Sequence, residues 1–212
     1  MNSISFGNPT NRQIQIVNQK TYLDDLFLMF KDEKQPSNES DITKHELNDI
    51  VERLADLKSP ENLTHLKRYS TIDRNLLHYL AYSLKPSQID IISLYDDIVS
   101  DVDSLIYKLK FNFQRPRPKT LAYYYKMKLF SLEEPKTESP SYPSRTVIVG
   151  NLICRIVGNR EPKLYDRSKI LMDDIISSRV YIGSNYATDV DFADKIAKEI
   201  VKNQKFAKKY AI

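Results

Sequence analysis

The chain has 212 residues, of which 41% are hydrophobic and 28% charged, and its formal net charge is +4. This composition excludes a disordered chain and fits one globular domain. The slight positive charge suits small anionic ligands but is too weak to indicate nucleic-acid binding by itself. The single cysteine, Cys154, excludes an internal disulfide and a cysteine-rich zinc site. The presence of only 4 glycines favours long helices over a sheet with many tight turns.

The first twenty residues are polar and show no clear apolar period, so residues 1–20 are expected to form an irregular arm. The start lacks a basic segment followed by an apolar one, so we expect no signal peptide. The most apolar run, TVIVGNLICRIVG, is interrupted by Asn151 and Arg155 and is too short and polar to span a bilayer. A cytoplasmic protein is the simplest interpretation.

Apolar residues that recur at spacings of three and four predict a series of helices in the first half of the chain. The stripes cover residues 22–30, 47–57, 76–84 and 86–110. Polar caps near Ser40 and Asp41 precede the second stripe, and Pro86 bounds the third. The segment QRPRPK is expected to stop the fourth helix, because each proline removes a backbone donor and restricts the residue before it.

The second half of the chain begins with a loop rich in proline and serine, SLEEPKTESPSYP, at residues 131–143. Ser144 or its neighbour is expected to begin an apolar helix, and a further helix over 164–182 should end before Gly183. A final amphipathic helix follows Asp189 and carries a lysine-rich outer face. No stretch alternates convincingly as a strand, so we predict a single all-α domain over residues 21–212.

Three short motifs contain the candidate chemistry. The first, KFNFQRPRP, places Lys110 seven residues before Arg117, although Lys108 and Arg115 have the same spacing. The second is PSRT, residues 143–146, at a predicted helix start, where a serine and free N–H groups can cap a helix or bind phosphate. Alone, each of these two motifs is more simply explained as a solvated loop or an ordinary helix cap.

The third motif, SRVYIGSNYATD, contains Ser178 and Arg179, then Asn185, then Asp189. Together and in this order, the motifs resemble the signature of the class A acid phosphatases, the soluble branch of the phosphatidic acid phosphatase type 2 and vanadium haloperoxidase superfamily. That signature reads K-x6-R-P, P-S-G-H and S-R-x5-H-x3-D. The continuation YATDVDFADKIA is also similar to the family's, and the resemblance covers residues 108–200.

The resemblance implies the helical bundle of that superfamily and a metal-independent hydrolysis of phosphomonoesters or pyrophosphate-type substrates through a phosphohistidine. No cofactor and no metal would be needed, and the partner would be a phosphorylated small molecule or inorganic phosphate. The implied phosphate-binding residues are Lys110, Arg117, Ser144, Arg145 and Arg179. Arginine suits this task because its planar fork donates two parallel bonds to two oxygens.

Both catalytic histidines of the family are replaced in this chain. Asn185 occupies the position of the nucleophile, which Asp189 would orient, and Thr146 occupies the position of the general acid. An asparagine amide has no free lone pair for attack, so the chain as written should bind phosphate esters and turn them over poorly or not at all. Arg145, next to Thr146, would favour pyrophosphate-type substrates if it turned toward a leaving phosphate. The three histidines, His45, His65 and His78, lie upstream and are expected at the surface or in helix packing.

Two explanations of Asn185 stay open at this point. In one, the protein is a natural pseudophosphatase that binds a phosphorylated ligand. In the other, an asparagine replaces a native histidine of an active enzyme. Asp189 favours the second account, because it has no obvious task without a histidine partner, whereas the Arg145-Thr146 pair favours the first. The third rival is an interaction protein that uses its lysine-rich last helix, although a solvated helix face explains those lysines better. The sequence leaves a homo-oligomer open.

Overall fold

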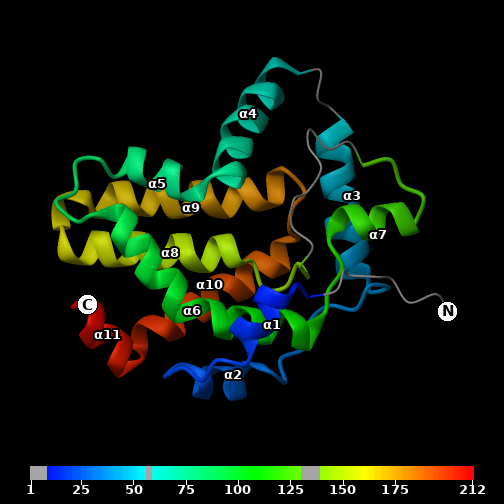
Figure 1. Cartoon of the computed structure of the whole chain (residues 1–212). Coiled ribbons are helices and arrows are strands. Elements are labelled where there is room, and N and C mark those ends of the chain that lie inside the picture. Colours follow the sequence, from blue (N-terminus) through cyan, green and yellow to red (C-terminus); the bar gives the residue numbers. More distant parts are fainter. Residues whose placement is uncertain (1–8, 56–58, 130–138) are drawn as a thin grey trace.

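The computed structural model describes residues 9–55, 59–129 and 139–212, and within these ranges it contains helices and no strand (Figure 1). The all-α prediction is therefore confirmed for the described part of the chain. The elements are α1 (Asn11–Val17), α2 (Asp24–Phe30), α3 (Asp41–Ala55), α4 (Pro60–Arg74), α5 (Leu76–Ser83), α6 (Ile91–Phe113), α7 (Pro118–Tyr124), α8 (Arg145–Arg160), the 3₁₀ turn η1 (Pro162–Leu164), α9 (Tyr165–Tyr181), α10 (Ala187–Lys202) and α11 (Gln204–Tyr210). None of the helices in these ranges combines the length and the apolarity needed to cross a membrane.

Helix α8 lies at the centre of the main hydrophobic core. Eleven of its 16 residues are buried, and a helix that is apolar on all sides belongs inside a protein. It contacts α6, α9 and α10, and Figure 1 shows α9 running alongside it. Residues such as Ile98 of α6 and Ile196 of α10 are completely buried against this centre. The N-terminal end of α8 is thereby held among the ends of several other helices.

The helices predicted from apolar spacing overlap the observed ones, although α3 begins at Asp41 and α6 at Ile91, and the end of the predicted 47–57 stripe, at 56–57, lies outside the described residues. The hydroxyl of Ser40 accepts a hydrogen bond from the backbone N–H of Thr43 at 3.2 Å, which confirms the predicted cap of α3. Helix α6 ends at Phe113, where the backbone of Gln114 turns into the left-handed region with φ of 53°, two residues before Pro116. The helix therefore ends at the position predicted from the prolines of the segment QRPRPK.

The expectation of an irregular N-terminal arm is wrong for residues 11–17, which form α1. The helix begins with a capping box, in which Thr10 Oγ1 accepts from the N–H of Gln13 at 3.2 Å and the Gln13 side chain accepts from the N–H of Thr10 at 2.8 Å. None of its residues is buried, so the sequence has no apolar period to detect. Helix α1 contacts α6, and local capping substitutes for a buried face.

Two further helices begin at a proline and were not predicted. Pro60 and Pro118 occupy the first positions of α4 and α7, where the missing N–H costs nothing and the fixed φ suits a helix. The final predicted helix begins earlier than expected, because α10 starts at Ala187 and contains Asp189 in its first turn. Most of the predicted 131–143 loop lies outside the described residues, and its last part, residues 139–143, is not helical.

A second, smaller core positions the segment that follows α9. Leu47, Ile50 and Leu54 of α3 pack with Leu121 of α7 and with the ring of Tyr186. Gly183 in this segment has φ of +70°, and a Cβ there would lie 2.9 Å from Cγ2 of Ile50, so both the turn and the close approach require glycine. The turn brings the N–H groups of Ser184 and Asn185 back to the carbonyl of Arg179, each at 3.1 Å.

Candidate functional site

The residues predicted from the three motifs converge in a buried cluster. Lys110 lies near the end of α6, Arg117 precedes α7, Ser144 precedes α8 and Arg179 lies in the last turn of α9. They meet around two residues of the third motif, Asn185 in the connection and Asp189 in the first turn of α10. The exposed fraction of Lys110, Ser144, Arg179, Asn185 and Asp189 is 4% or less, and Arg117 is partly exposed. The six residues that carry the three motifs thus lie together, and the phosphate-binding and catalytic roles assigned to them stay a prediction.

The structure distinguishes the two possible registers of the first motif. The ammonium group of Lys108 points to the N-terminal segment, where it donates to the carbonyl of Gln19 at 2.9 Å and to Asp24 at 2.7 Å. Lys110, two residues later, turns its ammonium group into the cluster and donates to the carbonyl of Pro140. Lys110 is therefore the lysine of the site, and Lys108 anchors the beginning of the chain.

Asn185 is fixed by four side-chain hydrogen bonds. Its Nδ2 donates to the carbonyl of Ser141 at 2.7 Å and to Oδ2 of Asp189 at 3.1 Å. Its Oδ1 accepts from Nε of Arg179 at 3.1 Å and from the hydroxyl of Ser144 at 3.3 Å. A carboxamide offers two N–H donors and a carbonyl acceptor, and the four bonds of Asn185 use both kinds of group. Asn185 therefore links the second and third motifs.

Asp189 has an ion-pair partner that the motif comparison did not assign. Nη1 of the buried Arg115 donates to Oδ1 of Asp189 at 2.7 Å, and both side chains are completely buried. The other oxygen of the carboxylate accepts from the backbone N–H of Tyr186 at 3.0 Å. The expectation that Asp189 lacks a task without a histidine is therefore wrong, and this argument for a replaced histidine no longer holds.

Arg115 also connects Asp189 to α3. Its Nη2 donates to Glu46 at 3.0 Å and to the hydroxyl of Thr43 at 3.1 Å, and its guanidinium carbon lies 4.0 Å from the ring centroid of Tyr186. Burial alone would lower the pKa of Arg115, but Asp189 and Glu46 raise it, so this arginine stays charged. The equal spacing of Lys108 and Arg115 was the only sequence signal that pointed to it.

Two cations of the cluster lack a carboxylate partner among the described residues. Lys110 contacts the carbonyl of Pro140, which also accepts from Nη2 of Arg117 at 3.3 Å. Arg117 donates further to the carbonyls of Ser139 at 3.0 Å and Ser184 at 2.8 Å. Burial, followed by the neighbouring charge of Arg117, holds the pKa of Lys110 well below its usual range. Burial also lowers the pKa of Arg117.

Arg179 connects the cluster to α4. Besides its bond to Asn185, it forms an ion pair with Asp73 of α4, whose side chain is 37% exposed. Burial lowers the pKa of Arg179 to about 10, against the attraction of Asp189. The cluster thus holds more positive than negative charge at its centre, with its acidic partners Glu46 and Asp73 toward the rim.

The N-terminal end of α8 contributes less than its sequence suggested. Ser144 is the residue before the helix, as predicted, but its hydroxyl bonds to Asn185 and does not cap the helix. Arg145 donates through Nε and Nη2 to the carboxylate of Asp103, at 2.7 and 2.9 Å. This bidentate pair competes with the phosphate-binding role assigned to Arg145. Thr146 lies half-buried in the first turn.

The three histidines, and four lysines of the C-terminal helices, face solvent or form other contacts. His45 and His78 are exposed, and His65 stacks near Tyr69 with ring centroids 5.9 Å apart. Four lysines of the C-terminal helices pair with acidic residues: Lys195 with Glu33, Lys198 with Asp194, Lys202 with Glu199 and Lys209 with Asp101. These pairs reduce the positive charge that the last helices present to a partner.

Comparison with known proteins adds no relative to this description: no protein-family model matches the chain, and neither does any curated protein. The interpretation of the cluster therefore depends on its geometry and not on a relative.

Proposed function

We propose that Lys110, Arg117 and Arg179 bind a phosphate group, either inorganic phosphate or the phosphoryl group of a phosphomonoester or diphosphate. The observation that supports this most is that Lys110 and Arg117 have no carboxylate partner in the described part of the chain. Lys110 is completely buried, and a buried cation without a counter-ion is costly, which is why the pKa of this lysine is lowered. An anionic ligand would supply the missing charge.

The hydrogen bonds of the cluster indicate how the ligand would enter. The carbonyl oxygens of Ser139, Pro140 and Ser184 now accept from Arg117, and the Pro140 carbonyl also accepts from Lys110. Phosphate oxygens are stronger acceptors of such bonds than neutral carbonyls, because charge-assisted bonds are about twice as strong. The ligand would replace these carbonyls, and it would approach past Arg117, the partly exposed member of the cluster.

We further propose that the protein is a pseudophosphatase of the acid-phosphatase type. Its fold would then be that of the phosphatidic acid phosphatase type 2 superfamily. The three-motif resemblance and the all-helical architecture support that relation. The replacement of the nucleophile by Asn185 supports the loss of turnover, because no lone pair is free for attack on phosphorus. The four bonds of Asn185 make it part of the binding framework.

Titration calorimetry of the purified chain with inorganic phosphate tests the binding. We expect binding accompanied by proton uptake, because the phosphate charge raises the lowered pKa of Lys110 back toward its usual value. The heat should therefore depend on the ionisation enthalpy of the buffer, and the affinity should fall as pH rises through the lowered pKa. Arg117→Gln should weaken binding at least about tenfold, and Arg160→Gln at an exposed position should not. Absence of binding to the unaltered chain would refute the proposal.

A second measurement tests the lack of turnover, using the release of phosphate from an aryl phosphate. We expect none from the unaltered chain and measurable release from Asn185→His, in which Asp189 can orient the imidazole. An aryl phosphate is the right substrate, because its leaving group needs little help from the missing general acid. Turnover by the unaltered chain within about tenfold of a typical enzyme rate of ~10 per second would mean that another group attacks.

A further inference from the structure

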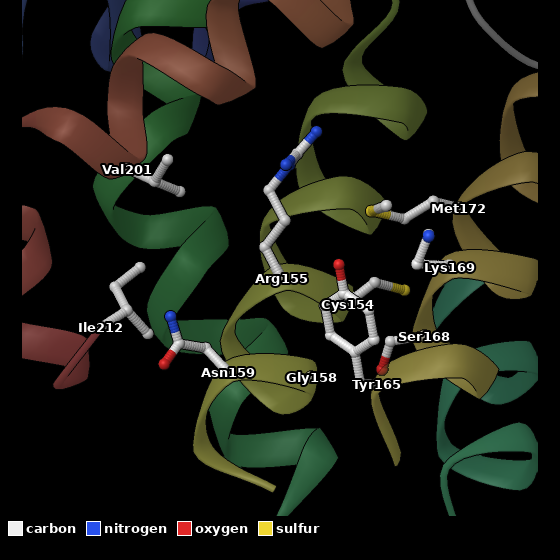
Figure 2. Close-up of a pocket in the computed structure, with 10 residues that line it drawn as sticks. All are labelled: Cys154, Arg155, Gly158, Asn159, Tyr165, Ser168, Lys169, Met172, Val201 and Ile212. Atoms are coloured by element: carbon white, nitrogen blue, oxygen red, sulfur yellow. The ribbon is translucent and has the colours of Figure 1, made fainter. Parts of the chain in front are cut away.

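A pocket of about 540 Å³ lies between α8 and α9, away from the cationic cluster, and the ends of α10 and of the chain border it (Figure 2). None of the six cluster residues lines it. Figure 2 shows the α9 side chains Ser168, Lys169 and Met172 on one side of Cys154, with Val201 and Ile212 on the other. The site is thus formed by other residues than the proposed phosphate site.

Part of the pocket lining is apolar. Cys154 is completely buried, and burial raises the pKa of its thiol to about 12, so the sulfur is protonated and behaves as a small apolar group. Gly158 packs closely against α9, where an added Cβ would lie 3.3 Å from Cβ of Ser168, and Met172 and Val201 are partly buried walls. Such a surface suits a hydrocarbon chain or ring and offers no nucleophile.

Two polar atoms of the lining residues have no hydrogen-bond partner among the described residues, Oγ of Ser168 and Nε of Arg155. Ser168 is 3% exposed, and its Oγ makes no hydrogen bond to the described residues. An unsatisfied buried hydroxyl costs about 1 to 3 kcal/mol, so a ligand oxygen that accepted its proton would remove a real penalty.

The mouth of the pocket carries a cation next to this serine. Lys169 is exposed, its Nζ lies 5.3 Å from the ring centroid of Tyr165, and it forms no ion pair with any described residue. Arg155 also lines the pocket, but its Nη2 donates to Asp194 at 3.0 Å, and Figure 2 shows its guanidinium turned away from Ser168. Lys169 is therefore the better partner for a single negative charge.

We propose that this pocket binds a monocarboxylic acid with an apolar chain. The chain packs against Cys154, Met172 and Val201, and the carboxylate accepts hydrogen bonds from Ser168 and Lys169. One carboxylate matches one available cation, whereas a phosphate dianion would leave charge unbalanced in a partly apolar site. The proposal shares no residue with the phosphate site and does not depend on it.

Methionine-methyl NMR with octanoate, below the concentration at which it forms micelles, tests this site in the intact chain. The sequence has only 4 methionines, so the signals are few. We expect the Met172 methyl signal to shift with saturable dependence on octanoate, while the signals of Met29 and Met127 stay unchanged. Octylamine, with the same chain and the opposite charge, should bind at least about tenfold more weakly. No shift of Met172, or equal binding of octylamine, would overturn the proposal.

Variants separate this site from nonspecific binding. Lys169→Gln should raise the Kd for octanoate about fivefold, and Ser168→Ala should raise it by a similar factor. Lys163→Gln removes the same charge from an exposed position that does not line the pocket and should leave the Kd unchanged. Equal effects of Lys163→Gln and Lys169→Gln would mean that general charge attraction, and not this pocket, recognises the acid. Lys110→Met should leave octanoate binding intact, which distinguishes the two sites.

Discussion

The variant Lys110→Met is expected to unfold less readily than the unaltered protein and to lose phosphate binding. Lys110 is 1% exposed, and its ammonium group has one carbonyl partner and no carboxylate partner among the described residues. Methionine keeps the length of the side chain and removes a buried charge that costs free energy. We expect the free energy of unfolding to rise by about 1 to 3 kcal/mol, measured by urea denaturation without phosphate.

The pH dependence of this gain identifies its cause. Since the pKa of Lys110 is lowered in the folded state, the unfolded chain binds the proton more tightly, and the charge destabilises the fold at pH values below the folded pKa. The increase in the free energy of unfolding caused by Lys110→Met should therefore be largest at pH values below the folded pKa. It should vanish as pH approaches the usual lysine pKa. Lys108→Met, two residues away, removes a lysine that is paired with Asp24, and should lower stability by less than about 1 kcal/mol. A destabilised Lys110→Met protein would contradict the assignment of an uncompensated charge.

The variant Asp189→Asn is expected to destabilise the fold by about 3 to 5 kcal/mol. The substitution keeps the shape of the side chain but removes the charge that faces the completely buried guanidinium of Arg115 at 2.7 Å. The loss of stability arises mainly because Arg115 then keeps Glu46, at the edge of the cluster, as its only carboxylate partner among the described residues. Thermal or urea unfolding measures it, and Glu199→Gln, in an exposed pair with Lys202, serves as the control with an effect below about 1 kcal/mol.

A double-mutant cycle tests whether Arg115 and Asp189 act as a pair. Combining Arg115→Met with Asp189→Asn removes both charges, so the loss should be smaller than the sum of the two single losses by at least about 1 kcal/mol. Additive losses would show that Asp189 stabilises the fold through Tyr186 and Asn185, and not through Arg115.

The sequence predicted the helices whose buried faces repeat regularly, and it did not predict those defined by local chemistry. Helix α6 buries Ile98, Val102 and Leu105 at the expected spacing. In contrast, α1 buries nothing and depends on the Thr10 cap, and α7 begins at a proline that was expected only to end a helix. Apolar spacing is a signal of burial, so elements held by caps or prolines escape it.

The same distinction applies to the site. Motif order was enough to predict that Lys110, Asn185 and Asp189 come together. It could not predict that Arg115 neutralises Asp189, because that choice depends on how the backbone turns at Gln114 and on Glu46, which lies far away in the sequence. The partner of an ion pair depends on which residues are neighbours in three dimensions. The spacing of Lys108 and of Lys110 from the following arginine is the same, so only the direction in which each lysine points from the helix distinguishes them.

The hydrogen bonds of Asp189 and its neighbour Thr188 also bear on the order in which the chain folds. The N–H of Thr188 donates to Glu46 at 2.7 Å across 142 positions of sequence, and Arg115 reaches Asp189 across 74. Contacts between such distant positions form only after large loops have closed, which makes them slow and late. During synthesis, Arg115 emerges well before the carboxylate that neutralises it. The cationic cluster is therefore completed only when α10 docks, so a chain in which the proposed phosphate site is complete has already folded its C-terminal third.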